Sequence, residues 1–393
     1  MKRREFLVTA CATPFVIRQL LADEPKHTVT YRQPSEKKFA YLELEGSYYD
    51  IGYQTGKNFG DNIKAAILRQ PDWHQNLMDI LKSPQGKTRS EEYLRLTRKY
   101  YPEIYEEIRG MADGAGLHFD ALWAMCIKSE LGALEKEPTG CSTIYFKDEQ
   151  HMWLFHNEDG NQAYRDIMFV LKATPPSGVT YLSMVYPGII TGNGPSMNSR
   201  GIIQSTNYIG STTSEVGIPR YIIGRAVLEA RDLKEAQDII TMEPRAYPYH
   251  HNIGSFADQK YISLETTPES WQHQEPAGVY CHTNHLLFDK TKDYQAEDQK
   301  YKQSSSMSRF EVINQEIPRL PEENPSPDNF LKILSSHTNA PYSPCRHPEG
   351  DVKGQTLGLA MFDFLEKKMR LYKGNPCIAT RECLFMDVKL DSL

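Results

Sequence analysis

The residue with the most distinctive chemistry in this sequence is Cys141, which precedes a run of β-branched and aromatic residues at 142–146. Such residues favour strands. A polar turn and a second run at 151–156 follow, and the second run leads into Asn157 and Asp159. Because two strands joined by a short turn are antiparallel, the Cys141 thiol is predicted to lie at the same end as these two polar side chains. A thiol in such surroundings is suited to nucleophilic catalysis.

Gly140 changes what the Cys141 thiol can do. A lone cysteine in a strand is most often a small buried hydrophobic residue. Here, however, glycine offers an unhindered carbonyl, so the thiol can attack the peptide bond between Gly140 and Cys141. Cleavage there would give Cys141 a free α-amine with a reference pKa of about 7.7–8.0. That amine can act as the general base for its own thiol near neutral pH, without a histidine.

These residues resemble the N-terminal nucleophile amidases of the acyl-coenzyme A:6-aminopenicillanic acid acyltransferase type, which are relatives of acid ceramidase and choloylglycine hydrolase. The resemblance rests on Gly-Cys-Ser-Thr at 140–143, on the step of 18 residues from Cys141 to Asp159, and on Asn157-x-Asp159. It covers roughly residues 40–390. It implies an α+β fold, a four-layer αββα sandwich with a mainly helical N-terminal pro-segment. It also implies an acyl-thioester on the cysteine and a linear amide (N-acyl) substrate.

Two later segments extend the resemblance. The segment His-Thr-Asn-His at 282–285 contains Asn284, which the family would use to stabilise the oxyanion. The segment Pro-Cys-Arg-His at 344–347 contains Arg346, a fixed cation beside the site. The resemblance implies a catalytic group made of Cys141, Asp159, Asn284 and Arg346, with Asn157 and Asn207 in support.

The chain departs from the acyltransferase pattern next to Asp159. Glu158 stands where an aromatic residue is more usual, and Gly160 follows the aspartate. Both changes alter the wall of the pocket, so penicillin-type substrates are not implied. The expected substrate is a small-molecule N-acyl amide. Whether water or another amine takes the acyl group, and hence whether the enzyme is a hydrolase or an acyltransferase, is left open.

Two alternatives to this function remain open. A papain-like hydrolase would use Cys141 with a histidine such as His282 as its base, and it would not cleave its own chain. A non-catalytic, exported binding protein could share the same scaffold without using the thiol. Both alternatives leave one intact chain, whereas the first hypothesis gives two fragments.

No metal and no cofactor are expected. His282 and His285 are three residues apart, so they would face opposite sides of a strand, and the adjacent His250 and His251 would also diverge. The seven cysteines are widely spaced and include no Cys-x-x-Cys pair. This spacing is typical neither of a zinc site nor of a dense disulfide framework.

The N-terminus has the features of an export signal. Arg3 and Arg4 precede an apolar stretch at 6–17, which predicts a twin-arginine signal over residues 1–22. The expected location is therefore periplasmic or extracellular. The residues before Cys11 also resemble a lipoprotein box, so a lipid anchor on Cys11 is an alternative hypothesis.

The remaining chain divides at the expected cleavage site. Residues 23–140 are predicted to be mainly helical and to form an α chain, and residues 141–393 a strand-rich β chain. A strand is expected at 39–46, and small residues in the helix beginning at Ser47 indicate close helix packing. Further helices are expected at 93–116 and from 119 to about 134, and a late hairpin at 356–372. The two fragments are expected to stay associated.

The overall composition excludes two classes of partner. The net charge is −6, and no long basic run follows the N-terminus, which argues against nucleic acid. No apolar stretch reaches the ~20 residues of a membrane span. With 39% hydrophobic and 24% charged residues, the composition is that of an ordinary folded protein.

Overall fold

The structure is a computed structural model of the whole chain. It describes residues 29–35, 38–132, 140–211, 214–294, 300–321, 325–378 and 384–393, and for residues 300–304 it describes the backbone alone. The predicted export signal at 1–22, including Cys11, lies outside the described residues.

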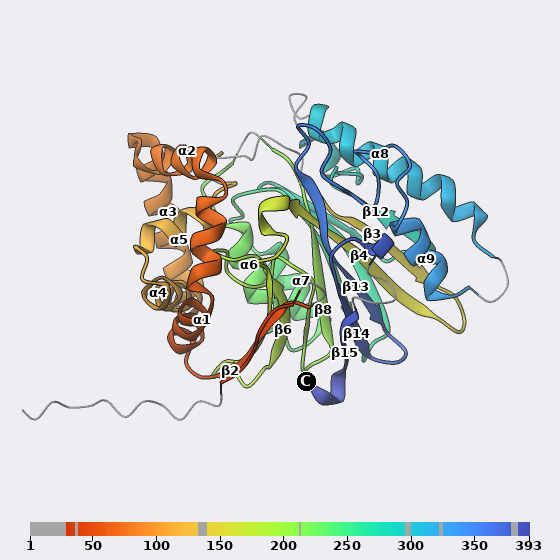
Figure 1. Cartoon of the computed structure of the whole chain (residues 1–393), viewed down its shortest axis with the longest axis horizontal. Helices are drawn as coiled ribbons and strands as arrows, with labels where there is room; N and C mark the ends of the chain where they lie inside the picture. Colours follow the sequence, from red (N-terminus) through yellow and green to blue (C-terminus); the bar gives the residue numbers. More distant parts are fainter. Residues whose placement is uncertain are drawn as a thin grey trace, which may run out of the picture.

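Two sheets form the centre of the molecule (Figure 1). Within the described ranges, the larger sheet has nine strands, in spatial order β1 (Thr30–Arg32), β2 (Ala40–Glu45), β5 (Phe169–Thr174), β6 (Tyr181–Val185), β7 (Ser196–Asn198), β8 (Ile202–Tyr208), β9 (Tyr249–Ser255), β10 (Lys260–Thr266) and β11 (Trp271–Gln274). The smaller sheet has six, in the order β12 (Gly278–His282), β3 (Ser142–Lys147), β4 (Met152–Asn161), β13 (Gly354–Asp363), β14 (Lys368–Lys373) and β15 (Leu384–Lys389). Strands β2 and β5 pair in parallel, and the other neighbours are antiparallel.

Helices cover the outer faces of both sheets. They are α1 (Tyr48–Leu68), α2 (Pro71–Lys82), α3 (Pro84–Tyr100), α4 (Pro102–Ala115), α5 (Phe119–Cys126), α6 (Arg220–Val227), α7 (Leu233–Thr241), α8 (Lys300–Glu316) and α9 (Pro327–Leu334). Short 3-10 turns lie at Gln162–Tyr164, Lys292–Tyr294, Ile317–Arg319 and Leu390–Ser392.

The layers follow the order helix, sheet, sheet, helix, which confirms the predicted α+β, αββα sandwich (Figure 1). Phe59 of α1 stacks on Phe169 of β5, with ring centroids 3.7 Å apart, and joins the first helical layer to the larger sheet. Tyr145 of β3 stacks on Tyr261 of β10 at 4.4 Å and joins the two sheets. Phe330 of α9 packs against β4 in the apolar cluster beneath the last helical layer. Aromatic side chains are thus buried at each interface between layers, and their burial stabilises the fold strongly.

The first helix confirms the expected close packing. The Ser47 side chain caps α1 by accepting a hydrogen bond from the Asp50 backbone at 3.1 Å. A Cβ atom on Gly52 would lie 1.9 Å from the Glu107 carbonyl oxygen of α4, and one on Gly56 would lie 2.2 Å from that of Met111. Only glycine lets the backbones of α1 and α4 approach this closely.

Three element boundaries differ from those predicted. The expected helix at 93–116 is two helices, because Pro102 lacks the N–H that a continuous helix requires. The helix beginning at Phe119 ends at Cys126 rather than near residue 134. Strand β4 continues to Asn161 instead of ending at residue 156, because its last residues pair with β13. The candidate residues Asn157 and Asp159 therefore lie within a strand.

The segment before Cys141 is an integral part of the sandwich. Strand β2 comes from this segment and pairs in parallel with β5, which follows Cys141 in the sequence. The late hairpin predicted at 356–372 is confirmed by β13 and β14.

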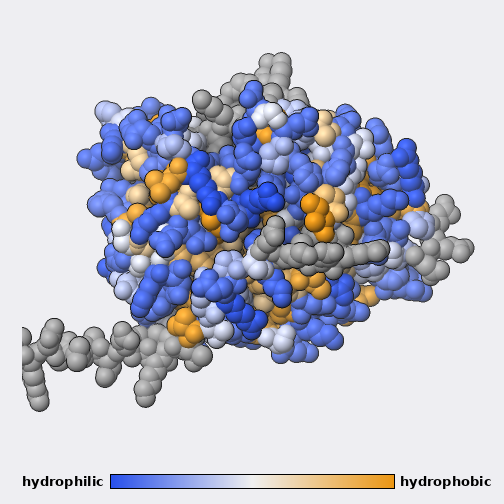
Figure 2. Space-filling view, viewed as in Figure 1, coloured by the Kyte–Doolittle hydropathy of each residue, from blue (hydrophilic) through white to orange (hydrophobic). Residues whose placement is uncertain are grey.

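The surface on the face drawn in Figure 2 is largely hydrophilic, with hydrophobic residues in small separate groups. In the part of the chain that the structure describes, no helix combines the length and the apolar character that a bilayer crossing requires.

Candidate active site

Cys141 lies at the entry to β3 and is 4% exposed. The register of the hairpin places Ser142 opposite Asn157, so Cys141 lies beside Glu158. The Cys141 Sγ donates a hydrogen bond to Glu158 Oε1 across 3.6 Å, and the Asp159 backbone hydrogen-bonds to the same sulfur. The hairpin therefore brings the thiol to the same end as Asp159, as its sequence indicated, and it also places Glu158 there.

Glu158 is the carboxylate in direct contact with the thiol, and it is a site residue that the sequence reasoning treated only as a change in the pocket wall. Its Oε1 also accepts a hydrogen bond of 2.7 Å from the Tyr186 hydroxyl. Its Oε2 lies 3.3 Å from Nε2 of His156. All these groups are buried. A proton acceptor is thus held against the nucleophile inside the sandwich.

The proton arrangement around His156 follows from its neighbours. The Thr143 hydroxyl donates its hydrogen to Asn207 Oδ1 at 3.1 Å. Its 2.9 Å contact with His156 Nδ1 therefore requires that Nδ1 carries a hydrogen. Nε2 of the same ring lies 3.3 Å from Glu158 Oε2, so the imidazole contacts the carboxylate that accepts from the thiol.

The thiol itself is difficult to ionise in the uncut chain. Burial raises the pKa of the Cys141 thiol well above its usual range, and the nearby charges of Glu158 and Asp159 raise it further. The reactive form of cysteine is the thiolate. Attack by Cys141 therefore requires a base that takes the proton as the new bond forms.

Asn284 holds the main chain at the start of β3. Its Oδ1 accepts hydrogen bonds from the Cys141 backbone N–H at 2.9 Å and from Arg309 Nη2 at 2.7 Å. Its Nδ2 donates to the Tyr208 carbonyl at 2.8 Å. These partners fix the orientation of the amide, because both groups at the oxygen are donors. An α-amine on Cys141 would therefore hydrogen-bond to Asn284 Oδ1. Because one Nδ2 hydrogen is bound by the Tyr208 carbonyl, the other is the one that can stabilise an oxyanion.

Arg309 on α8 is a second site residue that sequence reasoning missed. Its Nη1 donates to the Cys141 carbonyl at 2.6 Å and to the Ser142 hydroxyl at 3.0 Å. Burial lowers the pKa of its guanidinium to about 10, so it remains charged at neutral pH. No motif surrounds it in the sequence, and only the packing of α8 on the smaller sheet brings it to Cys141.

Gly140 fits between the same two side chains. A Cβ atom at this position would lie 2.3 Å from Asn284 Oδ1 and 2.6 Å from Arg309 Nη2. A side chain at this position would therefore displace Asn284 or Arg309 from its contacts with Cys141.

Asp159 lies on the side of the site that faces Arg309 and Arg346. Its Oδ1 accepts a 2.7 Å hydrogen bond from the Thr356 hydroxyl, while Oδ2 is buried and has no hydrogen-bond partner in the described ranges. Burial raises the pKa of Asp159 to about 6, although the charges of both arginines oppose the shift. Arg346 is fully buried, and its backbone N–H donates to Thr356 at 2.9 Å. The predicted pair of Asp159 and Arg346 is thus brought together beside the nucleophile.

The two supporting candidates, Asn207 and Asn157, lie at different distances from the thiol. Asn207 reaches the site, since its Nδ2 donates to the Cys141 carbonyl at 3.2 Å. Asn157 donates instead to the carbonyls of Leu334 and Pro344, at 3.0 and 2.9 Å. It therefore ties the segment before Arg346 to β4 and acts at a distance from the thiol.

The histidine suggested for a papain-like enzyme is engaged elsewhere. His282 lies 3.0 Å from Glu265 through Nε2 and 2.9 Å from the Thr283 carbonyl through Nδ1. Among the described histidines, His156 instead has a ring nitrogen within 4.8 Å of the Cys141 sulfur and of a Glu158 oxygen. These three side chains have the donor types of a metal site, but they already hydrogen-bond to one another through Glu158.

The chain is similar to several known proteins. A family model described as acyl-coenzyme A:6-aminopenicillanic acid acyl-transferase matches residues 146–377. The chain is 24% identical over 387 residues to the beta-alanyl-dopamine/carcinine hydrolase of Drosophila melanogaster, covering 89% of this chain and 96% of that protein. Crystal structures of two singly substituted forms of the conjugated bile acid hydrolase from Clostridium perfringens are 13% and 12% identical to it, with TM-scores of 0.41 and 0.35. Each of these two matches covers 59% of this chain and 89% of the other.

Proposed function

Because the chain belongs to the acyl-coenzyme A:6-aminopenicillanic acid acyl-transferase family, we propose that it is a self-cleaving amidase with Cys141 as its N-terminal nucleophile. The family and the relatives indicate an amide hydrolase or an acyltransferase. The observation that carries the finer proposal is the position of Cys141, directly after a tightly packed glycine and in contact with a buried carboxylate.

The first step of the proposed mechanism is maturation. The Cys141 sulfur attacks the Gly140 carbonyl carbon while Glu158 takes the thiol proton. The peptide C–N bond breaks, the new amine of Cys141 takes up a proton, and the acyl group remains on sulfur as a thioester. Water then hydrolyses the thioester and leaves Cys141 with a free α-amine.

The second step is turnover of a linear amide. The α-amine takes the thiol proton as sulfur attacks the substrate carbonyl, and the Asn284 amide stabilises the oxyanion. The protonated amine then donates to the leaving nitrogen. Asp159 fits the role of its counter-ion, because its Oδ2 is a buried acceptor with no described partner. Arg309 and Asn207 hold the Cys141 carbonyl, which keeps the nucleophile in place.

The name of the Drosophila melanogaster relative suggests the first substrates to test. Its name specifies amides of β-alanine with small amines, so we propose a small-molecule N-acyl amide of this kind. Purified protein would be incubated with β-alanyl-dopamine, with carcinine and with a conjugated bile acid, and the released amine measured by mass spectrometry. We expect release from at least one β-alanyl amide, and none with Cys141→Ala. A cleaved protein with an accessible thiol that hydrolyses none of these amides, nor any of a wider N-acyl panel, would favour the binding-protein alternative.

We expect protonation of Asp159 to lower the activity of the enzyme but to raise the stability of its fold. Its pKa is raised to about 6, so the carboxylate form needed as a counter-ion is lost, and kcat/KM falls, as the pH drops through about 6. The same raised pKa means that the folded state binds the proton more tightly than the unfolded chain. The contribution of Asp159 to the free energy of unfolding is therefore largest below about pH 3.9, the pKa of aspartate in the unfolded chain. This contribution is lost as the pH rises through about 6.

The two effects are measured as pH profiles of kcat/KM and of the melting temperature. In Asp159→Asn, the additional loss of activity below about pH 6 should disappear, leaving only the fall caused by protonation of the α-amine. The melting temperature should also vary less between pH 4 and 6. An unchanged acid limb in this variant would remove Asp159 from the mechanism.

A further inference from the structure

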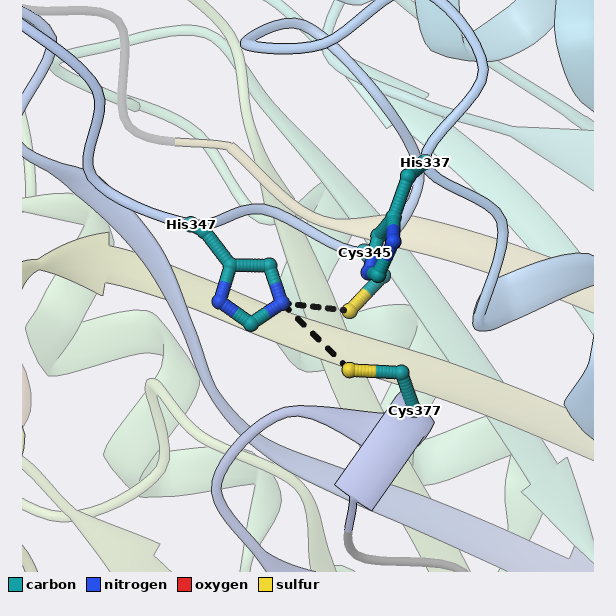
Figure 3. Close-up of side chains that lie close together, drawn as sticks. All are labelled: His337, Cys345, His347 and Cys377. Carbon is teal, nitrogen blue, oxygen red and sulfur yellow. Dashed lines mark hydrogen bonds between the residues drawn. The ribbon is translucent and has the colours of Figure 1, made fainter.

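A group of four metal-binding side chains lies outside the active site, in a part of the fold that the proposed reaction does not use. His337 follows α9, Cys345 and His347 lie in the loop before β13, and Cys377 follows β14 (Figure 3). One donor atom from each lies within 4.8 Å of the others. His347 Nε2 is 3.6 Å from Cys345 Sγ and 3.3 Å from Cys377 Sγ. We refer to these four residues as the Cys2His2 cluster.

The spacing of these atoms matches that around a tetrahedral zinc ion. Zinc binds sulfur at about 2.3 Å and imidazole nitrogen at about 2.0–2.1 Å, so a tetrahedral site places sulfur and nitrogen about 3.5 Å apart. The two distances from His347 Nε2, to the sulfurs of Cys345 and Cys377, lie on either side of this value. Both cysteines are free thiols in the structure. We propose that the Cys2His2 cluster binds one structural Zn²⁺ ion through all four side chains.

This site could not be recognised from the spacing of its residues. The cluster joins a Cys-x-His segment at 345–347 to a histidine eight residues before Cys345 and to a cysteine 30 residues after His347. Only the return of the chain through β13 and β14 brings Cys377 back to the loop (Figure 1). The expectation of no metal was based on histidine pairs that diverge and on the absence of a Cys-x-x-Cys pair, and neither argument applies when ligands from distant segments converge.

The location of the cluster suggests what the ion would do. Cys345 and His347 flank Arg346, whose backbone N–H donates to the Thr356 hydroxyl that also contacts Asp159. Asn375 donates to the Arg346 carbonyl and, at 3.5 Å, to the Cys345 sulfur. A site with four protein ligands has no open position for substrate and is structural rather than catalytic. Zinc would therefore fix the loop that holds Arg346 next to the active site.

Metal analysis of the full-length protein tests this proposal without depending on activity. Reduced protein would be incubated with Zn²⁺, freed of loose metal by gel filtration, and analysed for zinc per chain by mass spectrometry. We expect about one zinc in the wild type and less than about a tenth in Cys377→Ser and His337→Ala. These two positions are exposed, so the variants should fold. The matched controls His118→Ala and Cys126→Ala should keep the ion.

Two further measurements define the outcome. Co²⁺ in place of zinc should give the intense charge-transfer bands of thiolate ligands in the wild type and lose most of them in Cys377→Ser. A chelator should lower the melting temperature of the wild type but not of His337→Ala. Reduced wild-type protein that holds less than about a tenth of an equivalent of zinc would overturn the proposal. So would protein isolated from its native host with Cys345 and Cys377 joined in a disulfide as its only state.

Discussion

Cys141→Ala is expected to give a single uncut chain without amidase activity, whereas the wild type should appear as two fragments under denaturing conditions. The reason is chemical, since alanine has no sulfur to attack the Gly140 carbonyl and no thiol to carry the acyl group. Cys141→Ser should cut slowly at most, because a hydroxyl ionises far less readily than a thiol. Intact mass of the denatured proteins measures the result. The controls Cys126→Ala and Cys281→Ser replace other described cysteines and should still yield two fragments.

The same experiment under native conditions tests whether the fragments remain together. Strand β2 of the first fragment pairs with β5 of the second, and Phe59 stacks on Phe169 across the same junction. Separation would expose this apolar surface to water, so both fragments should elute from gel filtration as one species. Active wild-type enzyme that consists of a single chain crossing residue 141 would contradict the mechanism, because the α-amine could not then be the base.

The parts of the site that were predictable from the sequence are those set by local geometry or by matched motifs. The hairpin brought Cys141 and Asp159 to one end because its short turn fixes the register. Asn284 and Arg346 were found because their motifs resemble those of a known family, and the structure brings both to the same region.

The rest depended on packing between distant segments. Arg309 reaches Cys141 only because α8 lies on the outer face of the smaller sheet, and no local pattern distinguishes it from a surface arginine. Glu158 was adjacent to a predicted residue, but strand alternation was needed to see that it faces the thiol while Asp159 lies toward Arg309. The break between α3 and α4 at Pro102, by contrast, is local, because proline lacks the backbone N–H that a continuous helix requires.

Glu158→Gln is expected to slow self-cleavage about 10²–10⁴-fold, the usual contribution of a positioned general base. Two effects of this change oppose each other. Removing the negative charge lowers the pKa of the Cys141 thiol, which Glu158 helps to raise. It also removes the group that accepts the thiol proton, and a glutamine amide cannot replace it. The second effect should dominate, because the thiol is buried and the carboxylate is its acceptor in the uncut chain.

Turnover should respond differently from maturation. Once the chain is cut, the α-amine of Cys141 is available as the base, so kcat per mature site in Glu158→Gln should fall by less than about tenfold. The rate of cleavage would be followed on denaturing gels after rapid refolding, and mature sites counted from the amount of cleaved chain on the same gels. Tyr186→Phe is the matched control, because it removes the 2.7 Å hydrogen bond to Glu158 but leaves the carboxylate. Equal losses in cleavage and turnover would show that Glu158, not the α-amine, is the base in both steps, and an unchanged cleavage rate would exclude it from either.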